Sequence, residues 1–571
     1  MAISDPADAE TPLIDDTVDG CVDYKGLPVN RSGFGGWRSA YFIIGVEMAE
    51  RFAYFGIGSN LISYLTGPLG QSTAAAAANV NAWSGTTMVL PLVGAFVADS
   101  YLGRYRTIVA ASVIYVLGLG LLTLSAMLPS DCQNTNKSAS CSSHQFQVIL
   151  FFFSLYLVGV GQIGHKSCVQ AFGADQFDSQ DPEECKLKSS FFNWWYFGLS
   201  SSSLFTYLIL NYIQDNLSWG LGFGIPCIVM AIGLVVFLLG TQTYRYSIQR
   251  DEKSPFARIG LVFIAAVRNW QTAPPAIIVD EEARGIFPRQ SSEQFKFLDK
   301  ALLARDGSNE YRKVCSVSDV EDAKAFLGLV PIWTSSLMFP IVLSQSSTFF
   351  TKQGSTMDRS VTPGFDIPAA SLQTFVNLAI IITMPLYDRV FVPMARAFTG
   401  NPAGITMLQR IGTGMFMSVI SIVIAALVET KRLETAEEYG LVNEPNVTIP
   451  MHVWWLIPQY AIFGVAEAFT MVGLQEFFYD QVPTELRSVG LSLYLSIFGV
   501  GSFLSSFLIS AINNLTGGGN GQNSWFADNL NKAHLDYFYW LLACLGVLGF
   551  IVYLHFSKSY IYNRNNVLIA R

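Results

Sequence analysis

The stretch Gly45-Val46-Glu47-Met48-Ala49-Glu50-Arg51-Phe52-Ala53-Tyr54-Phe55-Gly56 decides the fold of this chain. It lies midway along the apolar run 37–65, which is long enough to cross a bilayer as a helix. Glu47, Glu50 and Arg51 are spaced i, i+3 and i+4, so they share one helical face. Each charge costs about 2.5–3.5 kcal/mol at a bilayer centre, so we expect the three to face the protein interior and to mark a functional site.

The composition predicts an all-α membrane protein. The 571 residues are 51% hydrophobic and only 14% charged, whereas an average soluble domain has about 25% charged residues. The formal net charge of −8 argues against nucleic acid as a partner. We find no metal-ligand spacing, nucleophile–base spacing or glycine-rich nucleotide loop. We therefore expect no cofactor, no metal site and no enzymatic activity.

Twelve apolar segments have the length of a membrane-spanning helix. Six precede and six follow a polar, proline-broken stretch at 242–325, and similar turn sequences follow the second and fourth spans of each set, which favours a duplicated fold with its site between the halves. The predicted division is a cytosolic tail (1–36), a six-helix bundle (37–241), a cytosolic linker (242–325), a second six-helix bundle (326–556) and a cytosolic tail (557–571). The expected spans are 37–65, 76–98, 107–128, 146–170, 190–210, 221–241, 326–349, 369–390, 404–428, 452–478, 488–512 and 534–556.

Basic residues orient these spans. Lys and Arg are concentrated on the side that holds the termini and the linker, which assigns that side to the cytosol. We assign every other Lys and Arg to the tails, the linker or the loops at the ends of the spans, so that only two basic residues, Arg51 and Lys166, lie at membrane depth. The acidic residues at depth are Glu47, Glu50, Glu467 and Glu476.

Several motifs together resemble those of the proton-coupled oligopeptide transporters, specifically their plant nitrate/peptide branch. They are Glu47-x-x-Glu50-Arg51-Phe52, Asp99-Ser-Tyr-Leu-Gly103-Arg104-Tyr105, Lys166 before Ala171-Phe-Gly-Ala-Asp-Gln-Phe-Asp178, and Tyr212-Ile-Gln-Asp-Asn216 before Gly222-Phe-Gly-Ile-Pro226. The resemblance covers nearly the whole chain and implies the major facilitator fold, with two six-helix bundles and alternating access.

The resemblance assigns proton coupling to Glu47, Glu50, Arg51 and Lys166. Elementary electrostatics agree, because two neighbouring carboxylates raise each other's proton affinity whereas the two cations lower it. Protons would be the coupling ion. The static alternative is a buried salt bridge, and His165 beside Lys166 is either a packing residue or part of the site.

We assign substrate binding to Lys166, Glu467, Tyr54, Leu343 and Gln345. Peptide carriers of the family hold the peptide carboxylate with a first-helix arginine, and Gly58 takes that place here. The seventh span lacks the acidic residue that is common in peptide carriers. Leu343 stands where a plant nitrate carrier has a histidine, so that mode of nitrate binding is also absent.

The predicted function is proton-coupled transport of a small solute, nitrate or a small organic anion, hormone or metabolite. The alternatives are a di- or tripeptide proton symporter and a vacuolar nitrate uniporter, and a solute sensor with a transporter fold is a different class. The segment Glu10-Thr-Pro12-Leu13-Ile14 resembles an acidic dileucine sorting signal and slightly favours the vacuolar over the plasma membrane.

Two further expectations concern single residues. Thr107 matches a phosphorylated threonine of a family nitrate carrier, which would make a kinase a partner; the alternative is a residue that begins the third span. Cys132 and Cys141 share one polar loop and would form a disulfide if that loop is not cytosolic.

Overall fold

The structure is a computed structural model of the whole chain. It describes residues 17–128, 137–178, 181–247, 255–270, 295–302, 315–399, 405–445, 447–482, 487–517 and 524–560. Cys132 and the segment 10–14 lie outside the described residues, so the disulfide and the sorting signal stay predictions.

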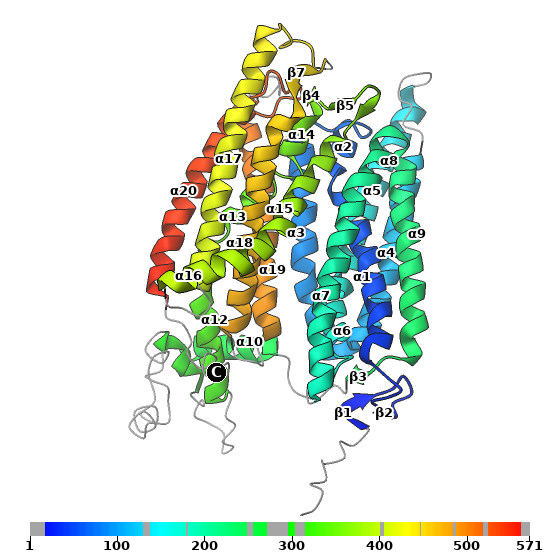
Figure 1. Cartoon of the computed structure of the whole chain (residues 1–571), viewed down its shortest axis with the longest axis vertical. Helices are drawn as coiled ribbons and strands as arrows, with labels where there is room; N and C mark the ends of the chain where they lie inside the picture. Colours follow the sequence, from blue (N-terminus) through cyan, green and yellow to red (C-terminus); the bar gives the residue numbers. More distant parts are fainter. Residues whose placement is uncertain are drawn as a thin grey trace, which may run out of the picture.

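Helices of the N-terminal half stand side by side in one bundle (Figure 1). Three of them are extended by a π-helical turn, where the hydrogen bonds skip one more residue than in an α-helix. The helices are α1 (Gly36–Gly58), α2 (Leu61–Thr66), α3 (Thr73–Val97), α4 (Arg104–Met127), α5 (Lys137–Gly164), α6 (Gln170–Ala174), α7 (Pro182–Phe205), α8 (Asn211–Asn216) and α9 (Trp219–Leu239). The π turns are η1 (Ala98–Leu102) after α3, η2 (His165–Val169) after α5 and η3 (Thr206–Leu210) after α7.

The C-terminal half forms a second bundle beside the first (Figure 1). Its helices are α12 (Val317–Ser335), α13 (Met338–Leu343), α14 (Phe349–Ser355), α15 (Thr374–Leu386), α16 (Val392–Thr399), α17 (Met407–Glu438), α18 (Ile457–Asp480), α19 (Arg487–Thr516) and α20 (Leu535–Ser559). The 3-10 turns η6 (Ala369–Gln373) and η8 (Val453–Leu456) precede α15 and α18, and the π turn η7 (Tyr387–Phe391) joins α15 to α16.

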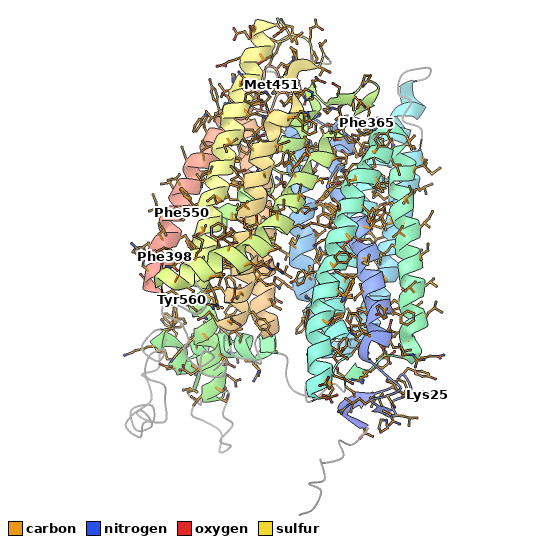
Figure 2. All side chains as sticks on the ribbon, in the orientation of Figure 1. Lys25, Phe365, Phe398, Met451, Phe550 and Tyr560 are labelled. Atoms are coloured by element: carbon orange, nitrogen blue, oxygen red, sulfur yellow. The ribbon has the colours of Figure 1, made fainter. Side chains whose placement is uncertain are left out.

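Ten helical segments of the described chain are long and apolar enough to cross a membrane. They correspond to every expected span except the first and the fifth. Those two are helical as well, as α1 and as the continuous run α7–η3–α8, but both carry charged side chains. Figure 2 shows Phe398 at the outer edge of the C-terminal half, with 88% of the residue exposed, as suits a surface that faces lipid.

Between the halves, the described part of the expected linker (242–325) contains β3 (Tyr246–Ser247), α10 (Pro255–Arg268) and η5 (Lys296–Leu302), and η4 (Gly240–Gln242) ends at its first residue. Helix α12 already begins at Val317, so the second bundle starts earlier than the expected residue 326. Helix α10 lies beneath the C-terminal half (Figure 1), where it packs against η5 and α12. Its buried residues include Val262 and Ala266, which join the core of that half. The linker is therefore docked on the second bundle over these residues.

Three small sheets lie at the ends of the bundles. Strands β1 (Thr17–Val22), β2 (Pro28–Asn30) and β3 (Tyr246–Ser247) form an antiparallel sheet in the order β2-β1-β3 beneath the N-terminal half (Figure 1). Strands β4 (Met357–Asp358) and β7 (Ile449–His452) pair in parallel at the opposite end, and β5 (Ser360–Thr362) pairs with β6 (Phe365–Asp366). In the first sheet, β1 and β2 come from the expected tail (1–36) and β3 comes from the expected linker (242–325).

A buried ion pair fixes the β1–β2–β3 sheet to the bundle. Arg245, which is 1% exposed, binds Glu184 at the start of α7 through two hydrogen bonds of 2.7 and 2.9 Å. Its guanidinium also donates to the carbonyls of Phe34 and Arg31, which tie the sheet to the start of α1. This fork geometry satisfies a charge that would be costly to bury alone.

The two halves meet along α3 and α19. At Gly85 a Cβ atom would lie 2.9 Å from the carbonyl oxygen of Gly499, so the absence of side chains permits this close approach. Hydrogen bonds also join the halves at the end that carries β4 and β7. They run from the amide of Thr73 to Asp528 (2.9 Å), from Gln373 to the carbonyl of Ser59 (3.0 Å), from Lys352 to Thr66 (3.1 Å) and from Ser371 to the carbonyl of Tyr207 (2.6 Å).

Candidate functional site

The three charges of α1 form a compact cluster within the N-terminal bundle. Glu47 is 2% exposed and Glu50 is fully buried, whereas 24% of the Arg51 side chain is exposed. The Arg51 Nε atom lies 3.7 Å from Glu47 Oε1 and 3.9 Å from Glu50 Oε2. The Arg51 guanidinium is therefore within ion-pair distance of both buried carboxylates. The three side chains lie on one face of α1, as their i, i+3, i+4 spacing predicted.

The hydrogen bonds of these carboxylates are incomplete. Glu50 accepts one from the amide of Gln162 on α5. The outer oxygens, Glu47 Oε2 and Glu50 Oε2, are buried without a hydrogen-bond partner, as is Arg51 Nε. Buried polar atoms without hydrogen-bond partners cost free energy. A proton or another ligand that bonds to these atoms would therefore stabilise the cluster.

Lys166 lies on the π turn η2 and has a different environment. Its ammonium is 4.4 Å from the centre of the Tyr54 ring and 3.5 Å from the carbonyl oxygen of Thr87. In the described part of the chain no carboxylate oxygen lies within ion-pair distance of it, and the side chain is half-buried. An aromatic face is a weak partner for a cation, so the ammonium can accept an anion.

Tyr54 and Trp83 fill the space beside Lys166. Their rings stack at a centroid distance of 5.5 Å, and the Trp83 indole donates to the carbonyl of Leu155 (3.0 Å). A Cβ atom at Gly58 would lie 3.3 Å from Trp83 Cζ3. A side chain at position 58 would therefore make a tight contact with this tryptophan, which would have to shift by a few tenths of an ångström.

Glu467 lies on α18 in the other half and is half-buried. Among the described residues, no hydrogen bond or ion pair joins it to the α1 cluster. Its role in substrate binding therefore stays a prediction.

Leu343 and Gln345 lie at the end of α13. Leu343 is half-buried and packs against two buried hydrophobic clusters, one with residues of both halves and one formed by the linker and the C-terminal half. Gln345 is fully buried and donates to the carbonyl of Ile341 (2.8 Å) and to Ser505 (3.1 Å), which also accepts from Asn81 of α3 (3.0 Å). Ser505 of α19 thus connects Gln345 of the C-terminal half to Asn81 of the N-terminal half.

Thr107 lies in the first turn of α4. It is 4% exposed, and its hydroxyl donates to the carbonyl of Gly103 (2.9 Å). Helix α4 begins at Arg104, and the Thr107 hydroxyl bonds back to a carbonyl and does not cap a backbone N–H, so both interpretations of Thr107 stay predictions. A kinase would reach the hydroxyl only after this turn opens.

Sequence reasoning missed one fully buried charge pair. Arg432 and Glu429 on α17 are both fully buried and bind each other through two hydrogen bonds of 2.6 and 2.8 Å. Arg432 also donates to Asn531 and to the carbonyl of Leu530. The i, i+3 spacing was the only available signal. Among the described residues, no group of three or more His, Cys, Asp or Glu side chains is arranged to hold a metal ion.

Comparison with known proteins identifies the family of this chain. The model of the POT family (PTR2) matches residues 105–526. The chain belongs to the POT family. Protein NRT1/PTR FAMILY 5.10 of Arabidopsis thaliana is 63% identical over 565 residues, 99% of each chain. Protein NRT1/PTR FAMILY 5.14 of the same plant is 57% identical over 559 residues, 97% of this chain and 99% of that one.

Solved structures agree on the fold of this POT family member. The crystal structure of an auto-inhibited POT family peptide transporter matches with a TM-score of 0.70 at 21% identity, covering 92% of this chain and 98% of that chain. The POT family transporter PepTSo matches with a TM-score of 0.67 at 19% identity, covering 92% and 98%. The predicted family and the predicted major facilitator fold are confirmed. The chain is a multi-pass membrane transporter, not an enzyme.

Proposed function

We propose that this POT family member couples the movement of protons to the transport of a small monovalent anion, namely nitrate or a small organic anion, hormone or metabolite. The observation that carries the proposal is the Lys166 ammonium, which rests on Tyr54 and has no carboxylate partner among the described residues. A substrate anion would supply the missing counter-charge. Glu467 and Leu343 would line the substrate path from the C-terminal half.

Charge balance explains why a proton would accompany the anion. With Glu47 and Glu50 ionised, the charges of Arg51 and Lys166 leave the cluster neutral. An added anion makes it negative, and an uncompensated charge is costly in a buried site. One proton on the cluster restores neutrality, so proton and anion bind better together than alone.

Peptide transport is the second candidate, because the solved structures with this fold include peptide transporters. Lys166 is equally able to bind a peptide carboxylate. Against this, Gly58 takes the place of the first-helix arginine of peptide carriers, and a Cβ atom there would already be in tight contact with Trp83. The residues 331–345 also carry no acid that would bind a peptide amino group. We therefore place the anion first.

The choice of membrane affects the energetics. At the plasma membrane an anion that enters alone works against the potential, at about 2.3 kcal/mol per 100 mV. At the vacuole the lumen is positive, so the potential itself favours anion entry and uniport becomes sufficient. We propose the vacuolar membrane ahead of the plasma membrane.

A panel uptake assay tests the proposal. Oocytes that express the chain receive nitrate, dipeptides, hormones or organic anions at acidic and neutral pH, with current recording. We expect anion accumulation that increases at acidic external pH and is lost in Lys166→Ala, whereas Lys431→Ala at the far end of α17 transports normally. Dipeptide accumulation would support the second candidate. Binding without accumulation would indicate a sensor, and accumulation independent of pH would indicate uniport.

A further inference from the structure

His165 is a buried imidazole that the charge balance above does not use. It is 1% exposed and begins the π turn η2, directly before Lys166. Its Nδ1 atom lies 3.7 Å from Glu47 Oε2, and both atoms are buried without a hydrogen-bond partner. The histidine therefore points at the one oxygen of Glu47 that Arg51 does not approach.

The hydrogen bonds of Ser112, on the other side of the ring, allow the hydrogen on His165 to be assigned. The Ser112 hydroxyl on α4 lies 2.8 Å from the carbonyl oxygen of Ile108, and we assign its one hydrogen to that bond. The 3.0 Å contact between Ser112 Oγ and His165 Nε2 is then donated by Nε2–H. Nδ1 of a neutral His165 consequently presents a lone pair to Glu47.

A lone pair facing an ionised carboxylate in a buried site is repulsive, and one proton removes the repulsion. The proton either makes His165 an imidazolium that pairs with Glu47, or it makes Glu47 neutral and able to donate to Nδ1. Both arrangements have the same total charge. The contact is thus a proton-binding site made of two residues from different helices.

The other ionisable groups around His165 are few. Helix α1 contributes Glu47, Glu50 and Arg51, α4 contributes Tyr115 with its ring centre 6.1 Å from that of His165, and η2 contributes Lys166. Helices α3 and α6 carry no ionisable residue, and α5 turns the amide of Gln162 toward Glu50. Glu47 is the carboxylate that the imidazole contacts.

We propose that His165 and Glu47 together bind the transported proton, and that His165 acts by exchanging with Arg51 as the counter-charge of Glu47. Without the proton, Glu47 depends on Arg51. With the proton on His165, the imidazolium holds Glu47. The partly exposed Arg51 then has Glu50 as its one remaining carboxylate partner in the cluster, and its guanidinium can turn toward the substrate anion beside Lys166. The proton moves between Nδ1 and Oε2, and no other bond changes. This inference rests on the proposed proton coupling.

The variant His165→Gln tests the exchange, because a glutamine amide keeps a donor for Ser112 but cannot hold the proton. The first assay measures nitrate uptake into proteoliposomes under an imposed pH gradient. The second measures exchange of nitrate across the same membrane at equal pH on both sides. We expect gradient-driven uptake to fall at least about fivefold and its pH profile to flatten, with a much smaller loss in exchange. The control His452→Gln changes a half-exposed histidine on β7 and leaves both unchanged.

The outcomes distinguish a failure of the proposed proton coupling from a failure of the proposed role of His165. If the unaltered chain shows no gradient-driven uptake, the proposed proton coupling fails. If it does show such uptake and His165→Gln has the same pH profile, the coupling stands and the role of His165 is wrong. A variant that loses uptake and exchange equally also contradicts the proposal, since a packing defect would do the same.

Nitrogen NMR of the unaltered protein gives a readout that does not depend on the variant's stability. With ¹⁵N-labelled histidine, the His165 signals are assigned by their loss in His165→Gln. We expect Nε2 to stay protonated throughout the titration, while Nδ1 changes its protonation. A neutral form with hydrogen on Nδ1 would overturn the assignment.

Discussion

Arg51 and Lys166 have different partners, although the sequence identified both as the basic residues at membrane depth. The spacing of Glu47, Glu50 and Arg51 predicted their shared face, because i, i+3 and i+4 contacts are local to one helix. The contact of Lys166 with Tyr54 was not predictable, because it depends on how η2 packs against α1. The same holds for His165, whose contact with Glu47 joins residues of separate helices.

Leu343 allows a test of the substrate pocket at one position. We expect Leu343→His to raise nitrate affinity by about tenfold, because a charge-assisted hydrogen bond contributes about 1.5–3 kcal/mol. The half-buried position leaves part of the side chain accessible. The measurement is the Michaelis constant for nitrate uptake, with Leu343→Gln as the uncharged control. Equal constants for the two variants would argue against Leu343 as a substrate contact.

The buried pair on α17 predicts a stability effect. Arg432→Ala leaves Glu429 as an unpaired, fully buried charge, which costs about 3–5 kcal/mol. We expect the thermal unfolding midpoint of the detergent-solubilised protein to fall clearly. Lys431→Ala is the matched control, since that exposed neighbour makes only a cation–π contact with Trp455. Equal midpoints for the two variants would show that the pair is not needed for stability.

At the scale of elements, hydrophobicity predicted where the spans lie but not how they are interrupted. No residue pattern in the sequence indicated the π turns, which are η1, η2, η3 and η7. A π turn changes the direction in which the side chains after it point, relative to a continuous α-helix. The turn η2 matters most, since it turns His165 toward Glu47 and Lys166 toward Tyr54. Helix α10 was also missed, because it lies in a polar stretch that contains several prolines.

The crossing of α3 and α19 predicts a steric effect. Gly85→Ala would place a methyl group 2.9 Å from the backbone of Gly499, and overpacking of this kind costs about 1–3 kcal/mol. We expect slower transport per folded molecule. Gly328→Ala on α12 is the control, because nothing lies within 4 Å of its Cβ position. Transport rates are normalised to the protein recovered, and equal rates for both variants would contradict a role for the crossing.

At the scale of the whole molecule, the sequence predicted two sets of six spans, and both sets form bundles (Figure 1). The sequence did not predict at which end of the molecule hydrogen bonds join the two halves. Asp528, Gln373 and Lys352 bind the N-terminal half at the end away from α10 and the first sheet. A carrier that alternates between two conformations must break these bonds in one of them, and that choice depends on conformational state rather than on residue pattern.

The most direct test of proton coupling is nitrate uptake into proteoliposomes under an imposed pH gradient, with the membrane potential clamped at zero. Under these conditions, we predict that the unaltered protein accumulates nitrate above its external concentration, and that Glu47→Gln does not, because it cannot exchange the proton. Accumulation by Glu47→Gln equal to that of the unaltered protein would contradict the account.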